Sequence, residues 1–194
     1  MLKFLKYNFS TFITIIFSFI SLIISFITLW CNRKHLDVVI ENELGDIENI
    51  FYNFNDYKND SPAMTFGKGK ICFIKIVNPS PKDIAFFDLR IVDMDTLKPI
   101  FFLTNGVLES IDCANKSIFS PVGEALAHLN YPNANYGILK SNSFTRFDIP
   151  FYPDNKNSTV LVSFKVAIST FSNNKESSYR KNFKYYKKVF NCSL

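Results

Sequence analysis

The chain has 194 residues, and its 22 Lys and Arg against 17 Asp and Glu give a formal net charge of +5. About 160 residues follow an apolar first segment, which is the size of one domain with a core of its own. The length therefore argues against several large domains. The absence of any C-x-x-C pair argues against a zinc ribbon or a thioredoxin-like redox site.

The first segment of the chain is long, apolar and uncharged. Phe9–Trp30 contains fourteen Phe, Ile or Leu among its 22 residues. As a helix it would extend about 33 Å, against about 30 Å for the hydrocarbon core of a bilayer. We therefore expect a transmembrane helix at residues 9–32, after a short basic tail at residues 1–8. The alternative is a cleaved secretory signal, but Trp30 does not fit the small residue that such a cut requires.

Seven polar residues within this helix recur at spacings that alternate between three and four. They are Thr11, Thr14, Ser18, Ser21, Ser25, Thr28 and Asn32. This spacing places them on one stripe of an α-helix, and small polar residues allow membrane helices to approach closely. We expect the stripe to contact a second copy of the helix or the helix of another membrane protein. The simpler interpretation is that each hydroxyl bonds the carbonyl four residues before it.

Basic residues flank the expected span on both sides. Lys3 and Lys6 precede it, and Arg33 and Lys34 follow it. The positive-inside rule, with the α-amine counted, favours a cytoplasmic N-terminus by a small margin. We therefore expect an uncleaved signal anchor in the cell membrane, with the soluble domain outside. The four cysteines favour the opposite side, where the compartment is reducing.

Residues 33–194 have the alternation of a β domain. Alternating apolar runs predict strands at residues 71–77, 85–91, 147–151, 160–168 and 179–190, separated by Pro, Asn, Asp and Ser turns. Weaker candidates lie at residues 36–40, 47–54 and 99–103, and a short helix is expected at residues 123–131. The expected fold class is mainly β: one transmembrane helix followed by an antiparallel β-sandwich of about seven to nine strands.

This architecture resembles the Ig-like modules that many membrane proteins display on a single helix. The resemblance covers the arrangement alone. Trp30 is the only Trp in the chain, so the Cys…Trp…Cys spacing of true Ig domains is absent.

Few residues predict a chemistry. A Cys113–His128 nucleophile pair, with Asp112 nearby, would support a membrane-tethered hydrolase, but no nucleophile-elbow sequence is present. The Gly-rich segment at residues 66–70 precedes a strand and predicts a hairpin turn rather than a phosphate loop. We expect no catalytic residues, cofactor or metal.

Two further hypotheses concern the cysteines and two neighbouring acids. Outside the cytoplasm, a Cys113–Cys192 disulfide would close a loop of about 80 residues. Cys72 alternates with core residues and is expected to be buried. Asp93 and Asp95 would offer oxygens to a cation, but they match the turn at a strand end.

The last predicted strand, at residues 178–190, is strongly basic. Residues 36–169 carry 16 acidic and 12 basic side chains, whereas residues 170–194 carry one acidic and six basic ones. Interleaved aromatics and lysines suit an anionic surface such as lipid if the domain faces the cytoplasm, although edge strands also use lysines against aggregation. The residues concerned are Arg180, Lys181, Lys184, Lys187 and Lys188. The membrane anchor argues against nucleic acid as a partner.

These observations favour a membrane-anchored, non-catalytic interaction module that assembles through its helix. The bilayer and a second membrane-embedded helix are the expected partners. The tethered hydrolase is the first alternative, and an accessory or effector protein of a mobile element is the second.

Overall fold

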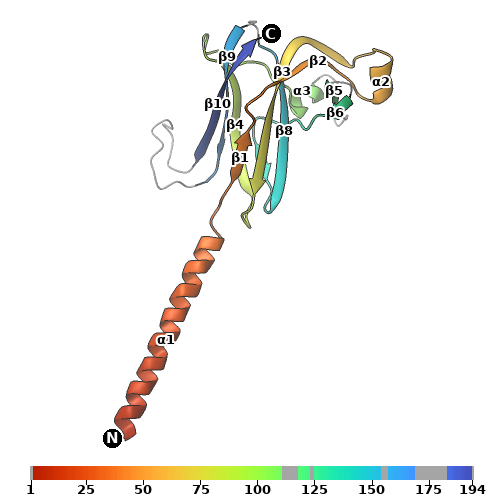
Figure 1. Ribbon diagram of the computed structural model, residues 1–194. Helices are drawn as coiled ribbons and strands as arrows, with labels where there is room; N and C mark the ends of the chain where they lie inside the picture. The colour runs from red at the N-terminus through yellow and green to blue at the C-terminus, as the bar shows by residue number, and fades with distance from the viewer. Residues whose placement is uncertain (1, 111–117, 123–124, 154–156, 169–182, 194) are drawn as a thin grey trace.

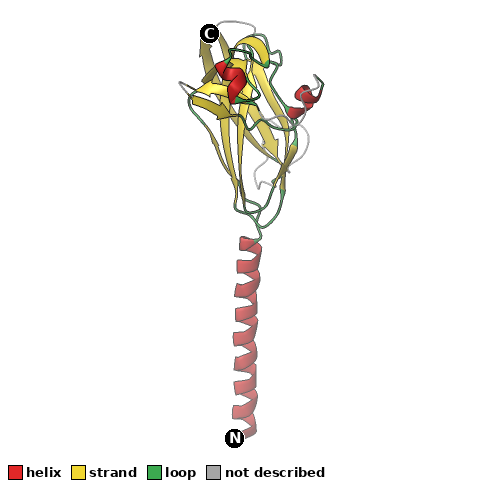
Figure 2. Cartoon of the chain, turned by 90° about the vertical axis from the view of Figure 1, so that its right-hand side faces the viewer, coloured by secondary structure: helices red, strands yellow, loops and turns green. Residues whose placement is uncertain are grey.

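The structure is a computed structural model in which a long N-terminal helix leads into a domain of antiparallel strands (Figure 1). It describes residues 2–110, 118–122, 125–153, 157–168 and 183–193. The strands extend in the same general direction as the helix, so one end of the domain adjoins the helix (Figures 1 and 2). The mainly β class with an N-terminal apolar helix is thus confirmed.

Helix α1 (Leu2–Cys31) projects away from the domain, and its segment Thr11–Cys31 buries no side chain within the chain. It begins at Leu2, so the expected N-terminal tail continues the same helix. Its segment Thr11–Cys31 is long and apolar enough to cross a membrane, and a secretory signal would meet the same test. Trp30 stacks on Phe26 in the last turns, with ring centroids 6.3 Å apart.

The first sheet contains four antiparallel strands. They are β1 (Asp37–Ile40), β2 (Gly45–Ile50), β3 (Met64–Asn78) and β8 (Ser143–Phe151). β8 pairs with one edge of β3, from Lys70 to Asn78. β1 and β2 pair with the other edge of β3, one after the other along the strand. The expected hairpin turn at residues 66–70 is wrong: these residues lie inside β3. A register shift against β2 and a positive φ of 85° at Gly67 accommodate the extra residues there.

The second sheet also has four antiparallel strands, in the order β10-β9-β4-β7. These strands are β10 (Lys184–Ser193), β9 (Asn157–Val166), β4 (Ile84–Asp93) and β7 (Gly137–Leu139). The predicted strand at residues 179–190 therefore overlaps β10, and its first four residues lie outside the described part of the chain.

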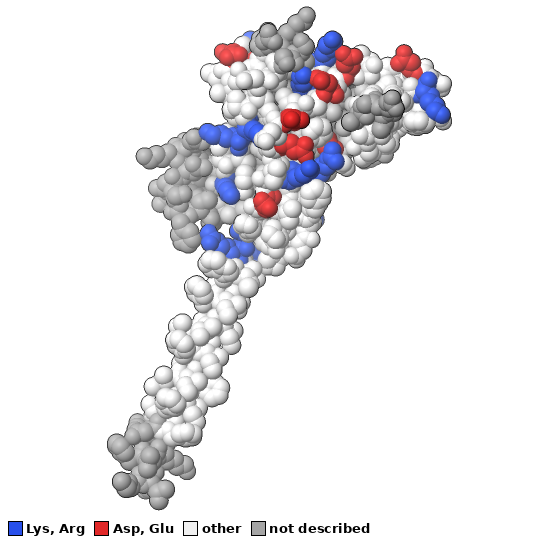
Figure 3. Space-filling view, in the orientation of Figure 1, with Lys and Arg blue, Asp and Glu red and all other residues white. Residues whose placement is uncertain are grey.

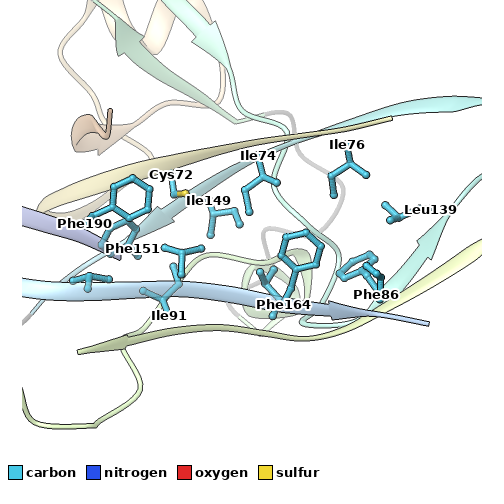
Figure 4. Packing of buried hydrophobic residues seen from close by; sticks show 14 of the residues in the cluster. Cys72, Ile74, Ile76, Phe86, Ile91, Leu139, Ile149, Phe151, Phe164 and Phe190 are labelled. Carbon is cyan, nitrogen blue, oxygen red and sulfur yellow. The ribbon is translucent and has the colours of Figure 1, made fainter. Parts of the chain in front are cut away.

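The main core lies between the two sheets, whose apolar side chains point toward one another (Figure 4). Cys72, Ile74 and Ile76 of β3 are buried, as their alternation predicts. Phe164 of β9 and Phe190 of β10 enter the same core from the other sheet. Burial of Cys72 is thereby confirmed.

The alternation expected along β4 holds for only half of the strand. The sequence predicts one apolar face made of Ala85, Phe87, Leu89 and Ile91. Leu89 and Ile91 are buried as predicted, but Ile84 and Phe86 are buried in place of Ala85 and Phe87. The pairing of β4 with β9 shifts register between Phe87 and Arg90, and this bulge exchanges the two faces of the strand.

The end of the domain far from the helix has a smaller core of its own. Residues of β2, β3 and α3 (Asn105–Glu109) contribute to it. The same end also contains α2 (Phe54–Lys58) and the hairpin of β5 (Phe119–Val122) with β6 (Ala125–His128). The short helix predicted at residues 123–131 is wrong, because β6 pairs with β5. The described part of the chain contains ten strands, more than the seven to nine expected, because β5, β6 and β7 all lie in a stretch where the sequence predicts no strand.

Candidate functional site

The outer face of the second sheet carries a groove of about 380 Å³. Strands β4, β9 and β10 form its floor, and the groove is open to solvent on the side that faces away from the core. Charged and aromatic side chains line it together: Asp88, Arg90, Lys165, Phe183, Tyr185 and Lys187.

Asp88 lies at the centre of the charged part of this groove. It occupies the β4 bulge and has a positive φ of 58°, a conformation that costs a non-glycine residue about 1–3 kcal/mol. Its carboxylate pairs with Arg90 and lies 2.7 Å from the Nζ atom of Lys165. The bulge therefore directs an acidic side chain outward between two cations. Bulges and strained residues of this kind are frequent at functional sites.

Aromatic rings complete the groove beside these charges. The ring of Phe183 packs edge-on against Phe87, with centroids 5.8 Å apart, and the Lys165 ammonium lies 5.2 Å from the Phe183 centroid. Lys187 lies 5.8 Å from the ring of Tyr185. Three basic side chains thus face one acid across an aromatic surface. Such a lining suits a partner that presents a carboxylate or another anion together with an apolar group.

The basic side chains of β10 do not form one surface, because they point to different sides of the sheet. Lys187 faces the groove, whereas Lys188 turns toward the first sheet and donates hydrogen bonds to the main-chain oxygen of Ile40, at 2.7 Å, and to Asn42. Lys184 lies 4.7 Å from the Tyr186 ring. The period of two along a strand explains this division. Of the other two predicted contacts, Arg180 and Lys181 lie outside the described residues.

The polar stripe of α1 is exposed along its length. Ser18 donates a hydrogen bond of 2.8 Å to the oxygen of Thr14, and Thr28 donates one of 2.8 Å to the oxygen of Ile24. At least two hydroxyls of the stripe therefore follow the simpler interpretation. The small residues nevertheless leave a shallow hollow of about 390 Å³, which Thr11, Thr14 and Ser18 line together with Ile15, Phe19 and Leu22.

The residues considered for catalysis are not assembled into a site that the structure describes. His128 is exposed on β6, where its ring packs edge-on against Phe119 with centroids 5.3 Å apart. Cys113 lies outside the described residues, as therefore does the predicted Cys113–Cys192 disulfide. Cys192 is buried in the main core and, like Cys72 and Cys31, has a free thiol.

The acidic pair at the end of β4 is a turn rather than an ion site. The carboxylate of Asp93 accepts hydrogen bonds from the amides of Asp95, at 2.8 Å, and Thr96, at 3.0 Å. These bonds hold the pKa of Asp93 below its usual value. Within the described residues, no group of three or more His, Cys, Asp or Glu is placed to hold a metal ion.

A second hollow, of about 700 Å³, lies between β2, α2 and β5. Four of its five charged side chains pair with one another: Lys70 lies 2.6 Å from Asp46, and Lys68 lies 3.8 Å from Glu48. The fifth is Asp60, so this hollow lacks the excess of positive charge that distinguishes the groove on the second sheet.

No family model, curated protein or solved structure matches this chain. The sequence alone does not predict the groove, because the simple alternation along residues 85–91 does not include the bulge in β4. The one signal was Asp88, an acidic residue inside an otherwise apolar run.

Proposed function

We propose that this chain is a single-pass, membrane-anchored interaction module with a non-catalytic, Ig-like β-sandwich outside the membrane. The observation that carries the proposal is the wholly unburied apolar segment Thr11–Cys31, joined to a domain with a complete core. Large apolar side chains on every side of a helix require lipid or another helix around them. Two four-stranded antiparallel sheets around one core support the sandwich architecture.

Retention of the helix distinguishes an anchor from a cleaved signal. The mature protein from cells should keep the mass of the full chain and should stay in the membrane after alkaline extraction. A mature protein that begins after Trp30 would overturn the anchor.

The side of the membrane is tested with an introduced cysteine. Thr96 is exposed on the turn after β4, so a Thr96→Cys variant, made with Cys31→Ser, offers an accessible thiol. We expect an impermeant maleimide to label it on intact cells. Labelling only after permeabilisation would place the domain in the cytoplasm.

The polar stripe of α1 supports assembly with a second copy of the helix. Because Ser18 and Thr28 bond their own helix, the stripe acts mainly through the close approach that small residues allow. Replacing Ser18, Ser21 and Ser25 together with Leu should abolish self-association in a membrane two-hybrid assay. The control replaces Ile16, Ile20 and Ile27 on the opposite face with Ala. If the two triple variants behave alike, the stripe is no interface.

We propose that the groove that contains Asp88 binds an acidic segment of a protein partner. The basic side chains of Arg90 and Lys165, which line the groove beside aromatic rings, support this choice. A photo-crosslinking residue at Tyr185 should capture the partner in membranes, and Lys187→Glu should abolish the product. The matched controls are a crosslinker at the exposed Tyr136 and the Lys98→Glu variant. A product that survives Lys187→Glu would exclude charge recognition in the groove.

A further inference from the structure

The end of the β domain beside the helix is formed by two turns, at residues 79–83 and 140–142, which we call the base. Both turns lie next to the end of α1 in two perpendicular views (Figures 1 and 2). Only residues 32–36 separate α1 from β1, and five residues extend at most about 18 Å. A helix that spans a bilayer therefore keeps the base close to the headgroups.

Side-chain and main-chain bonds hold the two turns together. Asn78, which is 1% exposed, donates hydrogen bonds to the main-chain oxygens of Lys82, Leu139 and Lys140 at 2.9–3.1 Å. The amide of Asn142 donates to the oxygen of Ser80 at 3.2 Å. The base is therefore one connected surface rather than two independent loops.

Apolar side chains project from the strands that enter the base. Phe144 is 60% exposed, and its direct cross-strand partner Val77 is 41% exposed. Ile138, on the strand before the second turn, is 61% exposed. Single exposed apolar residues are ordinary, but these three surround the one end of the domain that faces the proposed bilayer.

The charges around the base are mainly positive. Among the described residues at this end, five are basic, namely Arg33, Lys34, Lys82, Lys140 and Lys184, and two are acidic, Asp37 and Asp83. Asp83 is already engaged, because Lys140 lies 3.0 Å away and the amide of Ser141 donates to it at 2.8 Å. Figure 3 shows basic side chains gathered at the bottom of the domain beside the helix, with acidic ones farther up.

From this juxtaposition we propose that the base docks on an anionic phospholipid surface of the bilayer that holds α1. Phe144 and Ile138 enter the interfacial region, and Lys82 and its basic neighbours contact lipid phosphates. This inference rests on the membrane anchor proposed above and adds an orientation: the long axis of the domain stands upright and its groove faces sideways. Aromatic and basic residues together are the side chains that favour a membrane interface.

Tryptophan quenching by brominated lipid tests the docking in the full-length protein. Trp30 is the only native Trp, so the wild-type chain reports on the anchor itself. In a Trp30→Phe background, Phe144→Trp reports on the base. Phe54→Trp is the matched control, because Phe54 is 52% exposed but lies on α2 at the far end. We expect lipids brominated near the headgroup to quench the Trp30 and Phe144→Trp proteins and to leave the Phe54→Trp protein unquenched.

A second experiment varies the charge of the lipid and replaces one lysine of the base. Quenching of the Phe144→Trp protein should be stronger in phosphatidylglycerol vesicles than in phosphatidylcholine vesicles. Adding Lys82→Gln should lower the ratio of docked to undocked domains about fivefold, whereas Lys98→Gln should not change it. An unquenched Trp30 would overturn the anchor. A quenched Trp30 with an unquenched Phe144→Trp protein would overturn the docking alone, and quenching indifferent to lipid charge would overturn the preference for an anionic surface.

Discussion

The ammonium of Lys188 lies 2.7 Å from the main-chain oxygen of Ile40 and joins the edge strands of the two sheets. β10 carries the lysine and β1 carries the carbonyl, although these strands form no ladder with each other. The hydroxyl of Tyr186 approaches the oxygen of Leu36 in the same way, at 3.5 Å. Side chains of one sheet thus satisfy main-chain acceptors at the edge of the other, which also protects that edge from pairing with another chain.

Loss of this contact should destabilise the domain. Lys188→Met keeps most of the apolar stem but leaves the oxygens of Ile40 and Asn42 without their donor. We expect the free energy of unfolding to fall by about 2 kcal/mol, the range for a hydrogen bond to a charged group. Denaturant unfolding of the full chain in detergent measures it. Lys184→Met, on the same strand but exposed, should cost no more than about 0.5 kcal/mol.

A negative charge in place of the Asn78 amide should destabilise the domain. Asn78→Asp would place a carboxylate where an amide now donates to three main-chain oxygens. At neutral pH we expect a loss of about 3 kcal/mol in unfolding free energy. Lowering the pH to about 4 should restore part of it, because a protonated carboxyl regains one donor. An Asn133→Asp variant, exposed and without this clamp, should show neither effect.

Asp83 should contribute stability that acid removes. The Ser141 amide, followed by the Lys140 ammonium, lowers the pKa of the Asp83 carboxyl in the folded state. The contribution is therefore present above the ordinary carboxyl pKa of about 4 and is lost as pH falls through the lower folded value. Unfolding curves of wild type and Asp83→Asn should differ at pH 7 and converge in strong acid.

The two buried thiols should resist alkylation. Burial raises the pKa of the Cys72 thiol to about 12 and also raises that of Cys192. At pH 8 both therefore remain protonated as well as inaccessible, whereas Cys31 is exposed. Mass mapping after maleimide treatment in detergent should find Cys31 modified and Cys72 unmodified until the protein is denatured. Rapid modification of native Cys72 would contradict the packing of the two sheets.

Strand periodicity was sufficient to predict much of the fold. Cys72, Ile74 and Ile76 alternate without interruption, and the structure buries all three. β4 was harder, because the bulge at Asp88 moves the buried face from one set of alternate residues to the other. A bulge depends on the neighbouring strand, which local sequence does not reveal. The helix predicted at residues 123–131 is wrong for the same reason. β6 forms a strand because it pairs with β5, and the local sequence does not reveal this partner.

The candidate site was likewise predictable only in part. The stripe on α1 follows from spacing alone, since a helix fixes its own geometry. The groove depends on three strands that are distant in sequence, and on which face of β10 each lysine occupies. A cluster of basic residues in one segment was therefore read as one surface, although Lys187 and Lys188 point to opposite sides of the sheet.

The direct connection from α1 to β1 also determines how the domain would respond to mechanical tension. A pull on the helix is transmitted through residues 32–36 to Asp37, along the direction in which β1 runs. The load then acts in shear on the whole β1–β3 ladder, from Asp37↔Val77 to Ile40↔Ile74, rather than opening one pair after another. Because Lys188 bonds the same strand from its other side, β1 is held along both of its edges under such a load.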